Sequence, residues 1–99
     1  MKAIIFNEEE DICRVEINNY KYNRIKQVDS YNGTFDVQET ISFLPNNYDD
    51  VKDFIIQSGR EINFMIYDED DKVGMYQPSI EMDDVKEKIT MIKIKTFWF

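Results

Sequence analysis

Carboxylates are the only chemically reactive side chains that cluster in this sequence. They form two runs of four: Glu8, Glu9, Glu10 and Asp11, and Asp68, Glu69, Asp70 and Asp71. Hard cations such as Ca²⁺ and Mg²⁺ take several carboxylate oxygens, so a cation site is one interpretation of these runs. However, the spacing does not follow an EF-hand loop, and consecutive residues of an extended chain point to opposite faces. We therefore interpret both runs as solvated turns and expect no metal site.

Catalysis would depend on the same carboxylates, because the 99 residues include no His. Glycoside hydrolysis needs two carboxyl groups held across a cleft, one of them with a raised pKa, whereas acids clustered in turns stay ionised. The single cysteine, Cys13, has no His to activate it, and its alternation with Val15 and Ile17 predicts a small buried hydrophobe. The three glycines are too far apart to form a phosphate-binding loop. We expect a protein that is not an enzyme and uses no cofactor.

Length and charge set the class of protein. A chain of 99 residues predicts one domain over 1–99, and a 42% hydrophobic content is enough to build a core. The formal net charge of −8 argues against nucleic acid as a direct partner, because phosphate binding needs clustered positive charge. No apolar run approaches the roughly 20 residues of a membrane helix, so no membrane insertion is expected. One unpaired cysteine suits a reducing compartment.

Most of the secondary structure that the sequence predicts is β-strand. Short strands are expected at residues 3–6 and 12–17, the second with period-2 alternation. Residues 20–43 predict an antiparallel hairpin whose turn is Asn32-Gly33, a pair that favours a type I′ turn. The apolar phase changes between Tyr22 and Ile25, which predicts a bulge near Asn23-Arg24.

One helix is expected, at residues 47–58. Asn46-Asn47 can cap it, Asp49 and Asp50 suit its first turn, and Gly59 can take a left-handed conformation at its end. Strand patterns resume after it, with turns expected at 68–71 and at Asp83-Asp84. The sequence therefore predicts a mainly β (α+β) fold: a small antiparallel β-sandwich or barrel of about seven strands, with one helix covering an open end or face.

The last strand, 88–99, places Ile92, Ile94 and Trp98 on one face and Lys93 and Lys95 on the other. Phe97, Trp98 and Phe99 cannot all share a face. If Trp98 enters the core, Phe97 and Phe99 point outward, where they could dock on a neighbouring protein or pack against the helix.

The layout resembles the small β-barrel-plus-helix modules of phage tail tubes and baseplates. The resemblance rests on the long strand 34–44, the helix 47–59, the strand 60–67, the 68–71 hairpin and the final strand 88–99. It implies a non-enzymatic subunit, such as a tail, baseplate or connector part, that docks on itself or on neighbouring subunits through sheet edges and termini. Such a subunit would be found in the bacterial cytoplasm or assembled into a virion.

Two functions from different classes therefore remain open. The first is a phage-type assembly protein that forms oligomers through Phe97, Trp98, Phe99 and a free strand edge. The alternative is an acidic inhibitor whose two acidic runs mimic DNA and block a host nucleic-acid enzyme.

Overall fold

The computed structural model describes residues 1–59, 61–67 and 72–99. The elements follow in the order β1 (Lys2–Asn7), β2 (Ile12–Asp29), β3 (Thr34–Pro45), α1 (Tyr48–Ser58), β4 (Ile62–Ile66), β5 (Gly74–Tyr76), β6 (Ser79–Asp83) and β7 (Lys88–Trp98). All strand pairs are antiparallel and join into one sheet with the order β5-β4-β1-β2-β3-β7-β6. The expected mainly β class, with seven strands and one helix in the described residues, is confirmed.

The sheet curls on itself around the core. β3 and β4 are three strands apart in the sheet order, which corresponds to about 14 Å in a flat sheet. Nevertheless, the rings of Phe43 in β3 and Phe64 in β4 stack with their centroids 5.3 Å apart. Helix α1 closes this core with Tyr48, Val51 and Ile55, all of them buried. We call the curled part of the sheet, together with α1, the body.

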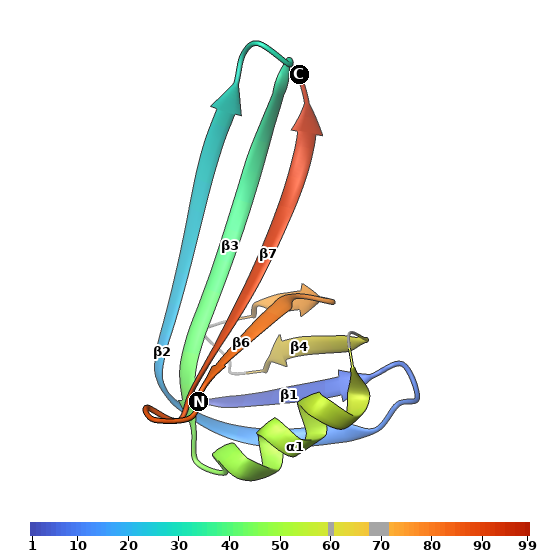
Figure 1. The fold of residues 1–99 in the computed structure, drawn as a ribbon, viewed down its shortest axis with the longest axis vertical. Helices are drawn as coiled ribbons and strands as arrows, with labels where there is room; N and C mark the ends of the chain where they lie inside the picture. The colour runs from blue at the N-terminus through green and yellow to red at the C-terminus, as the bar shows by residue number, and fades with distance from the viewer. Residues whose placement is uncertain (60, 68–71) are drawn as a thin grey trace.

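Three strands continue beyond the body as an arm. The far parts of β2, β3 and β7 rise together away from α1, β1 and β4, and the C-terminus lies at the tip (Figure 1). The molecule is therefore elongated, with extents of 45 × 29 × 27 Å. We define the arm as residues 19–42 and 93–99.

The expected hairpin is present, but its bulge is in a different place. β2 and β3 pair from Lys21↔Ser42 to Asp29↔Thr34, and the register shifts between Asn18 and Lys21. Asn19 lies there with φ 51°. The prediction of a bulge near Asn23-Arg24 is wrong because Ile25 does not belong to the apolar face that contains Tyr22. Ile25 lies on the opposite face and is exposed.

The hairpin turn also differs from the prediction. A type I′ turn needs positive φ at both central residues, but only Gly33 (φ 67°) has it, and Asn32 does not. Residues 30–33 instead form a longer connection, in which Asp29 accepts hydrogen bonds from the backbone and side-chain nitrogens of Asn32. These bonds lower the pKa of the Asp29 carboxyl.

The helix begins and ends close to where the sequence places it, but its N-terminus is not capped by a side chain. Asn47 makes no side-chain cap; its carbonyl accepts from Val51 N instead, and the Asn46 side chain accepts a hydrogen bond from Asn18. Gly59, with φ 68°, ends the helix as predicted. None of the described helices is long and apolar enough to cross a membrane.

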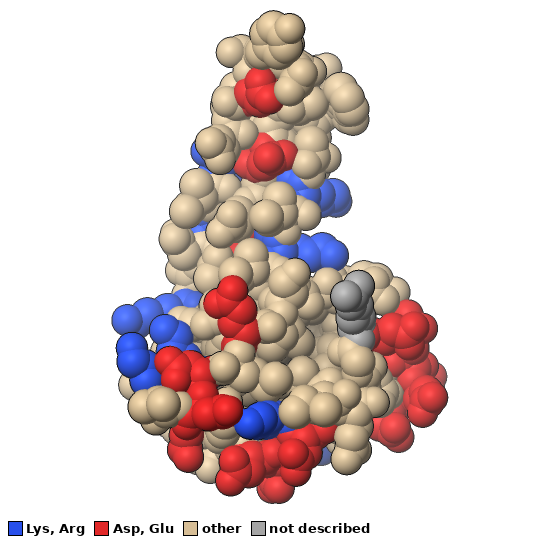
Figure 2. Space-filling view, in the orientation of Figure 1, with Lys and Arg blue, Asp and Glu red and all other residues tan. Residues whose placement is uncertain are grey.

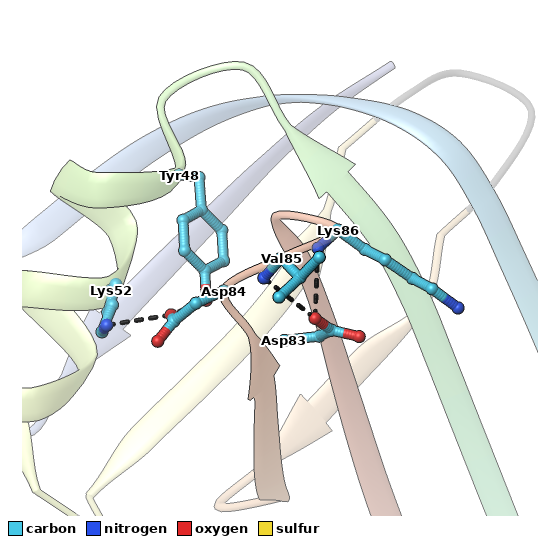
Figure 3. A network of polar contacts seen from close by, with 6 residues as sticks. All are labelled: Tyr48, Lys52, Asp83, Asp84, Val85 and Lys86. Atoms are coloured by element: carbon cyan, nitrogen blue, oxygen red, sulfur yellow. Dashed lines mark hydrogen bonds and ion pairs between the residues drawn. The ribbon is translucent and has the colours of Figure 1, made fainter.

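A polar network joins α1 to the β6–β7 turn (Figure 3). Tyr48 Oη donates to Asp84 Oδ1 at 2.6 Å, and Lys52 Nζ lies 2.9 Å from the same oxygen. Asp83 Oδ1 accepts from the backbone nitrogens of Val85 and Lys86, which shapes the turn expected at Asp83-Asp84. Burial and the Asp84 carboxylate raise the pKa of Tyr48 to about 12, and the two donors lower the pKa of Asp84.

Candidate interaction surface

The fold separates charge along the length of the molecule. The arm carries five Lys or Arg residues against three acids (Asp29, Asp36 and Glu39), a formal balance of +2. The remaining residues, which include the body, carry seven Lys or Arg and seventeen acids, a balance of −10. In Figure 2 the acidic side chains gather over the lower part of the molecule, and basic side chains project from the middle of the arm.

One face of the arm, which we call the aromatic face, continues the core-facing side of β3. It carries a ladder of rings and cations that crosses all three strands. Lys26 Nζ lies 4.5 Å from the Phe35 ring centroid, Phe35 stacks on Phe97 at 5.0 Å, and Lys95 Nζ lies 5.3 Å from the Phe97 centroid. Phe99 contacts Phe35 at 5.7 Å. Phe35 and Phe97 therefore each contact both another ring and a cation.

The opposite face of the arm, the polar face, carries the small polar residues of β3 and a few apolar residues at its sides. Thr96 Oγ1 donates to Asp36 Oδ1 at 2.6 Å. Ile25 on β2 and Ile94 and Trp98 on β7 are 51%, 58% and 78% exposed. Apolar side chains on this face therefore remain in water along both outer strands.

Both outer strands of the arm have a free edge among the described residues. β1 pairs with β2 only over Ile12–Glu16, and β6 pairs with β7 only over Lys88–Ile92. Beyond these segments, β2 and β7 each pair with β3 alone. Among the described residues, the fold thus exposes two edges on a narrow three-stranded sheet, and such edges can pair with another strand.

The hydrogen-bond pattern between β3 and β7 shows which backbone groups of β7 point away from the sheet. Phe99 N donates to the Gly33 carbonyl oxygen at 3.0 Å, and hydrogen-bonded pairs alternate with non-bonded pairs in an antiparallel ladder. The pairs Phe35/Phe97, Val37/Lys95 and Glu39/Lys93 therefore exchange hydrogen bonds within the arm. The residues between them on β7, namely Ile94, Thr96 and Trp98, direct their N–H and C=O groups outward.

The same alternation of hydrogen-bonded pairs shows which residues of β2 direct their backbone groups outward. The residues of β3 that do not bond to β7 bond to β2, opposite Asn23, Ile25, Gln27 and Asp29. The residues of β2 whose backbone groups point outward are then Tyr22, Arg24, Lys26 and Val28. Two cations therefore occupy the centre of the free β2 edge, whereas the three outward residues of β7 are uncharged.

The predicted aromatic residues lie at the tip of the arm. Phe97 is half-buried in the ladder, and Trp98 and Phe99 are 78% and 73% exposed on opposite faces. Packing of this end against the helix, one of the two alternatives, is wrong, because it pairs with the start of β3 at Thr34 and Phe35, far from α1 (Figure 1). Trp98 also does not enter the core.

Only the first of the two acidic runs lies within the described residues. Glu8, Glu9 and Glu10 lie in the β1–β2 turn, which Asn7 closes by hydrogen bonds with Asp11. The second run, Asp68 to Asp71, lies outside the described residues. Among the part of the chain that the structure describes, no group of three or more acidic or cysteine side chains could hold a metal ion.

Cys13 is a partly buried residue that packs against the core. Burial, followed by the nearby Asp50 carboxylate, raises the pKa of the Cys13 thiol. A raised pKa keeps the sulfur protonated at neutral pH, which disfavours its use as a nucleophile. The interpretation of Cys13 as a small hydrophobe agrees with its position beside Val15 and Ile17.

Two features were missed by sequence reasoning. The first is the separation of charge between arm and body, because Arg24, Lys26, Lys93 and Lys95 come from two distant strands. The second is which residues along the two free edges direct their backbone N–H and C=O groups outward. The alternation of Lys93 and Lys95 with Ile94 was a signal for the first, but strand order was needed to place those lysines beside Arg24 and Lys26 on the arm.

Comparisons with protein-family models, with curated proteins and with solved structures each found no match to this chain.

Proposed function

We propose that the protein is a non-enzymatic assembly module that joins other protein subunits through its arm. The observation that carries this proposal is a three-stranded arm with two free edges and exposed apolar side chains on a compact body. A projecting sheet of this kind contributes little to the core, since its outer residues remain in water. It offers unpaired backbone groups and apolar area to a partner.

The proposal names a phage-type structural part, such as a tail, baseplate or connector subunit, found in the bacterial cytoplasm or in a virion. Its support is the layout of strands and helix described above, together with an Ile-, Lys-, Asn- and acid-rich composition that suits an AT-rich genome. The partners are copies of the same chain or neighbouring subunits. No cofactor is required for this role.

The test is the mass of the purified protein over a concentration series, by light scattering after size exclusion, with negative-stain images of any large species. A defined oligomer, ring or tube whose population rises with concentration would support assembly through self-association. A monomer at every concentration would contradict self-association.

A second candidate is an acidic inhibitor that mimics DNA. The observation that favours it is the −10 balance of the residues outside the arm, with acids gathered over the lower part of the molecule (Figure 2). Charge pairing would dominate such a complex, so its affinity would fall steeply with salt. Charge reversal at Glu8–Asp11 should abolish binding to a DNA-binding enzyme, and salt-insensitive binding would contradict the inhibitor role.

A further inference from the structure

We infer that two copies of this chain pair through the free edge of β7, antiparallel and centred on Thr96. This inference rests on the proposed assembly function and names its partner and its register. It would create one continuous six-stranded sheet with the strand order β2-β3-β7-β7-β3-β2, related by a two-fold axis through the two Thr96 residues.

The choice of edge follows from charge. On β2 the outward backbone groups include those of Arg24 and Lys26, and any β2–β2 register that engages all four outward residues places Arg24 opposite Lys26 of the second copy. Cations in the centre of an edge are a common means of preventing sheet extension. β7 also carries two cations, Lys93 and Lys95, but a register centred on its outward residue Thr96 does not place them opposite each other.

The direction of pairing follows from the bodies. A parallel pair of β7 strands would bring two strongly acidic bodies to the same end of the dimer. An antiparallel pair sends them to opposite ends, where salt screens their repulsion over distances beyond about 8 Å. The distribution of charge between arm and body therefore favours the antiparallel dimer.

The register follows from the outward residues and from their neighbours. Centring on Thr96 pairs Ile94 with Trp98 of the second copy and engages all three outward residues of each strand, with about six backbone hydrogen bonds. It also brings two exposed apolar side chains together, Ile94 of one copy and Trp98 of the other, so that each shields the other from water. On the aromatic face it places Lys95 opposite Phe97 and Lys93 opposite Phe99, pairs in which a cation can lie over a ring.

Neighbouring registers are poorer. Centring on Lys95 places the two Lys95 ammonium groups opposite each other, which is destabilising. Centring on Phe97 engages only two outward residues from each strand and leaves Ile94 without a partner. The Thr96 register is therefore the one that satisfies most backbone groups without opposing like charges.

The experiment is cysteine cross-linking in a Cys13→Ala background. In the proposed register, two cysteines from Thr96→Cys lie about 5.5 Å apart between Cα atoms, within disulfide range. Two cysteines from Ile94→Cys are four residues out of register, about 13 Å apart along the strands, and cannot join. We expect Thr96→Cys to form a disulfide dimer at least about tenfold faster than Ile94→Cys under mild oxidation.

A mixture of Ile94→Cys and Trp98→Cys chains gives a second readout that leaves Thr96 intact. It should form mixed dimers, because these two positions are opposite each other. The inference is overturned if Thr96→Cys cross-links no faster than Ile94→Cys and the mixture forms no mixed dimers, while light scattering still shows an oligomer. In that case the proposed assembly function stands with another interface. If light scattering shows only a monomer, self-assembly and the β7 dimer both fail.

Discussion

The body and the arm are made from the same three strands but are stabilised differently. In the body, Phe43, Ile89 and Met91 are at most 1% exposed and pack in one core with residues from β1, β4 and α1. In the arm, the same strands have no layer covering them, and they rely on the aromatic ladder and on hydrogen bonds to β3. β2, β3 and β7 are therefore longer than the core needs, and their extra length creates free edges.

The arm and the body also differ in charge. The acids lie mostly outside the arm, and the arm has a small excess of cations placed beside aromatic rings. A surface with one sign of charge at one end and apolar area at the other favours defined orientations between copies.

The largest effect is expected for loss of a ring in the body core. Phe64 is 1% exposed and stacks on Phe43, so Phe64→Ala should lower the free energy of unfolding by about 3–5 kcal/mol. The corresponding change in the arm, Val37→Ala, removes two methyl groups and should cost about 1.5 kcal/mol. Urea denaturation followed by circular dichroism measures both. Equal losses would mean that arm and body are equally important for folding.

The next effect concerns the two free edges. Proline at an outward-facing edge position removes no backbone hydrogen bond of the monomer but takes away one donor to a partner. Thr96→Pro also loses the side-chain hydrogen bond from Thr96 to Asp36 on the polar face. Thr96→Pro should therefore abolish the dimer in light scattering, and Arg24→Pro, on the edge of β2, should leave it intact. Loss of the dimer in the Arg24→Pro variant alone would assign assembly to β2 instead.

A smaller effect is expected from side chains at the tip. Trp98→Ser should weaken self-association about tenfold, because it uncovers Ile94 of the second copy, and it should change the urea midpoint little, since Trp98 is already 78% exposed. Tyr31→Ser is the control, as Tyr31 is 97% exposed at the same tip and has no place in the proposed interface. Similar weakening by both variants would indicate nonspecific contact between apolar tips.

The smallest effect is expected at the joint between α1 and the β6–β7 turn. Tyr48 and Lys52 lower the pKa of Asp84 below its ordinary value of 3.8. This contribution to stability is present above pH 3.8 and is lost as the pH falls through the lower folded-state pKa. Asp84→Asn should therefore show a shallower acid loss of stability than the wild type, by thermal melts from pH 6 to pH 2. The dimer should be unaffected at neutral pH, because Asp84 lies in the body.

Local sequence patterns predicted much of the fold. Period-2 alternation located the strands near 12–17 and 34–43, and the spacing of Tyr48, Val51 and Ile55 located the helix that packs on the core. These patterns succeed because burial of one face is recorded in the order of apolar residues. The bulge was predicted in the wrong place because Ile25 is apolar yet exposed. An exposed apolar residue makes the buried face of a strand seem to change sides where it does not.

The candidate surface was predicted only in part. Phe97, Trp98 and Phe99 were singled out because three successive aromatic residues cannot share one face of a strand, and that reasoning holds in the structure. The lysine–phenylalanine ladder could not be found in the same way, because Lys26, Phe35 and Lys95 are far apart in sequence and meet only through strand pairing.

Composition and local patterns were enough to predict the class of this protein: a mainly β chain with one helix, a high density of acids and no histidine. These properties depend on composition and on residues close together in the chain. Strand pairing was needed to show that three strands extend past the core, that the arm is basic while the rest is acidic, and which residues direct their backbone groups outward along each free edge. Those features arise from strand order and register, which join residues distant in sequence and set the outward direction of each backbone group.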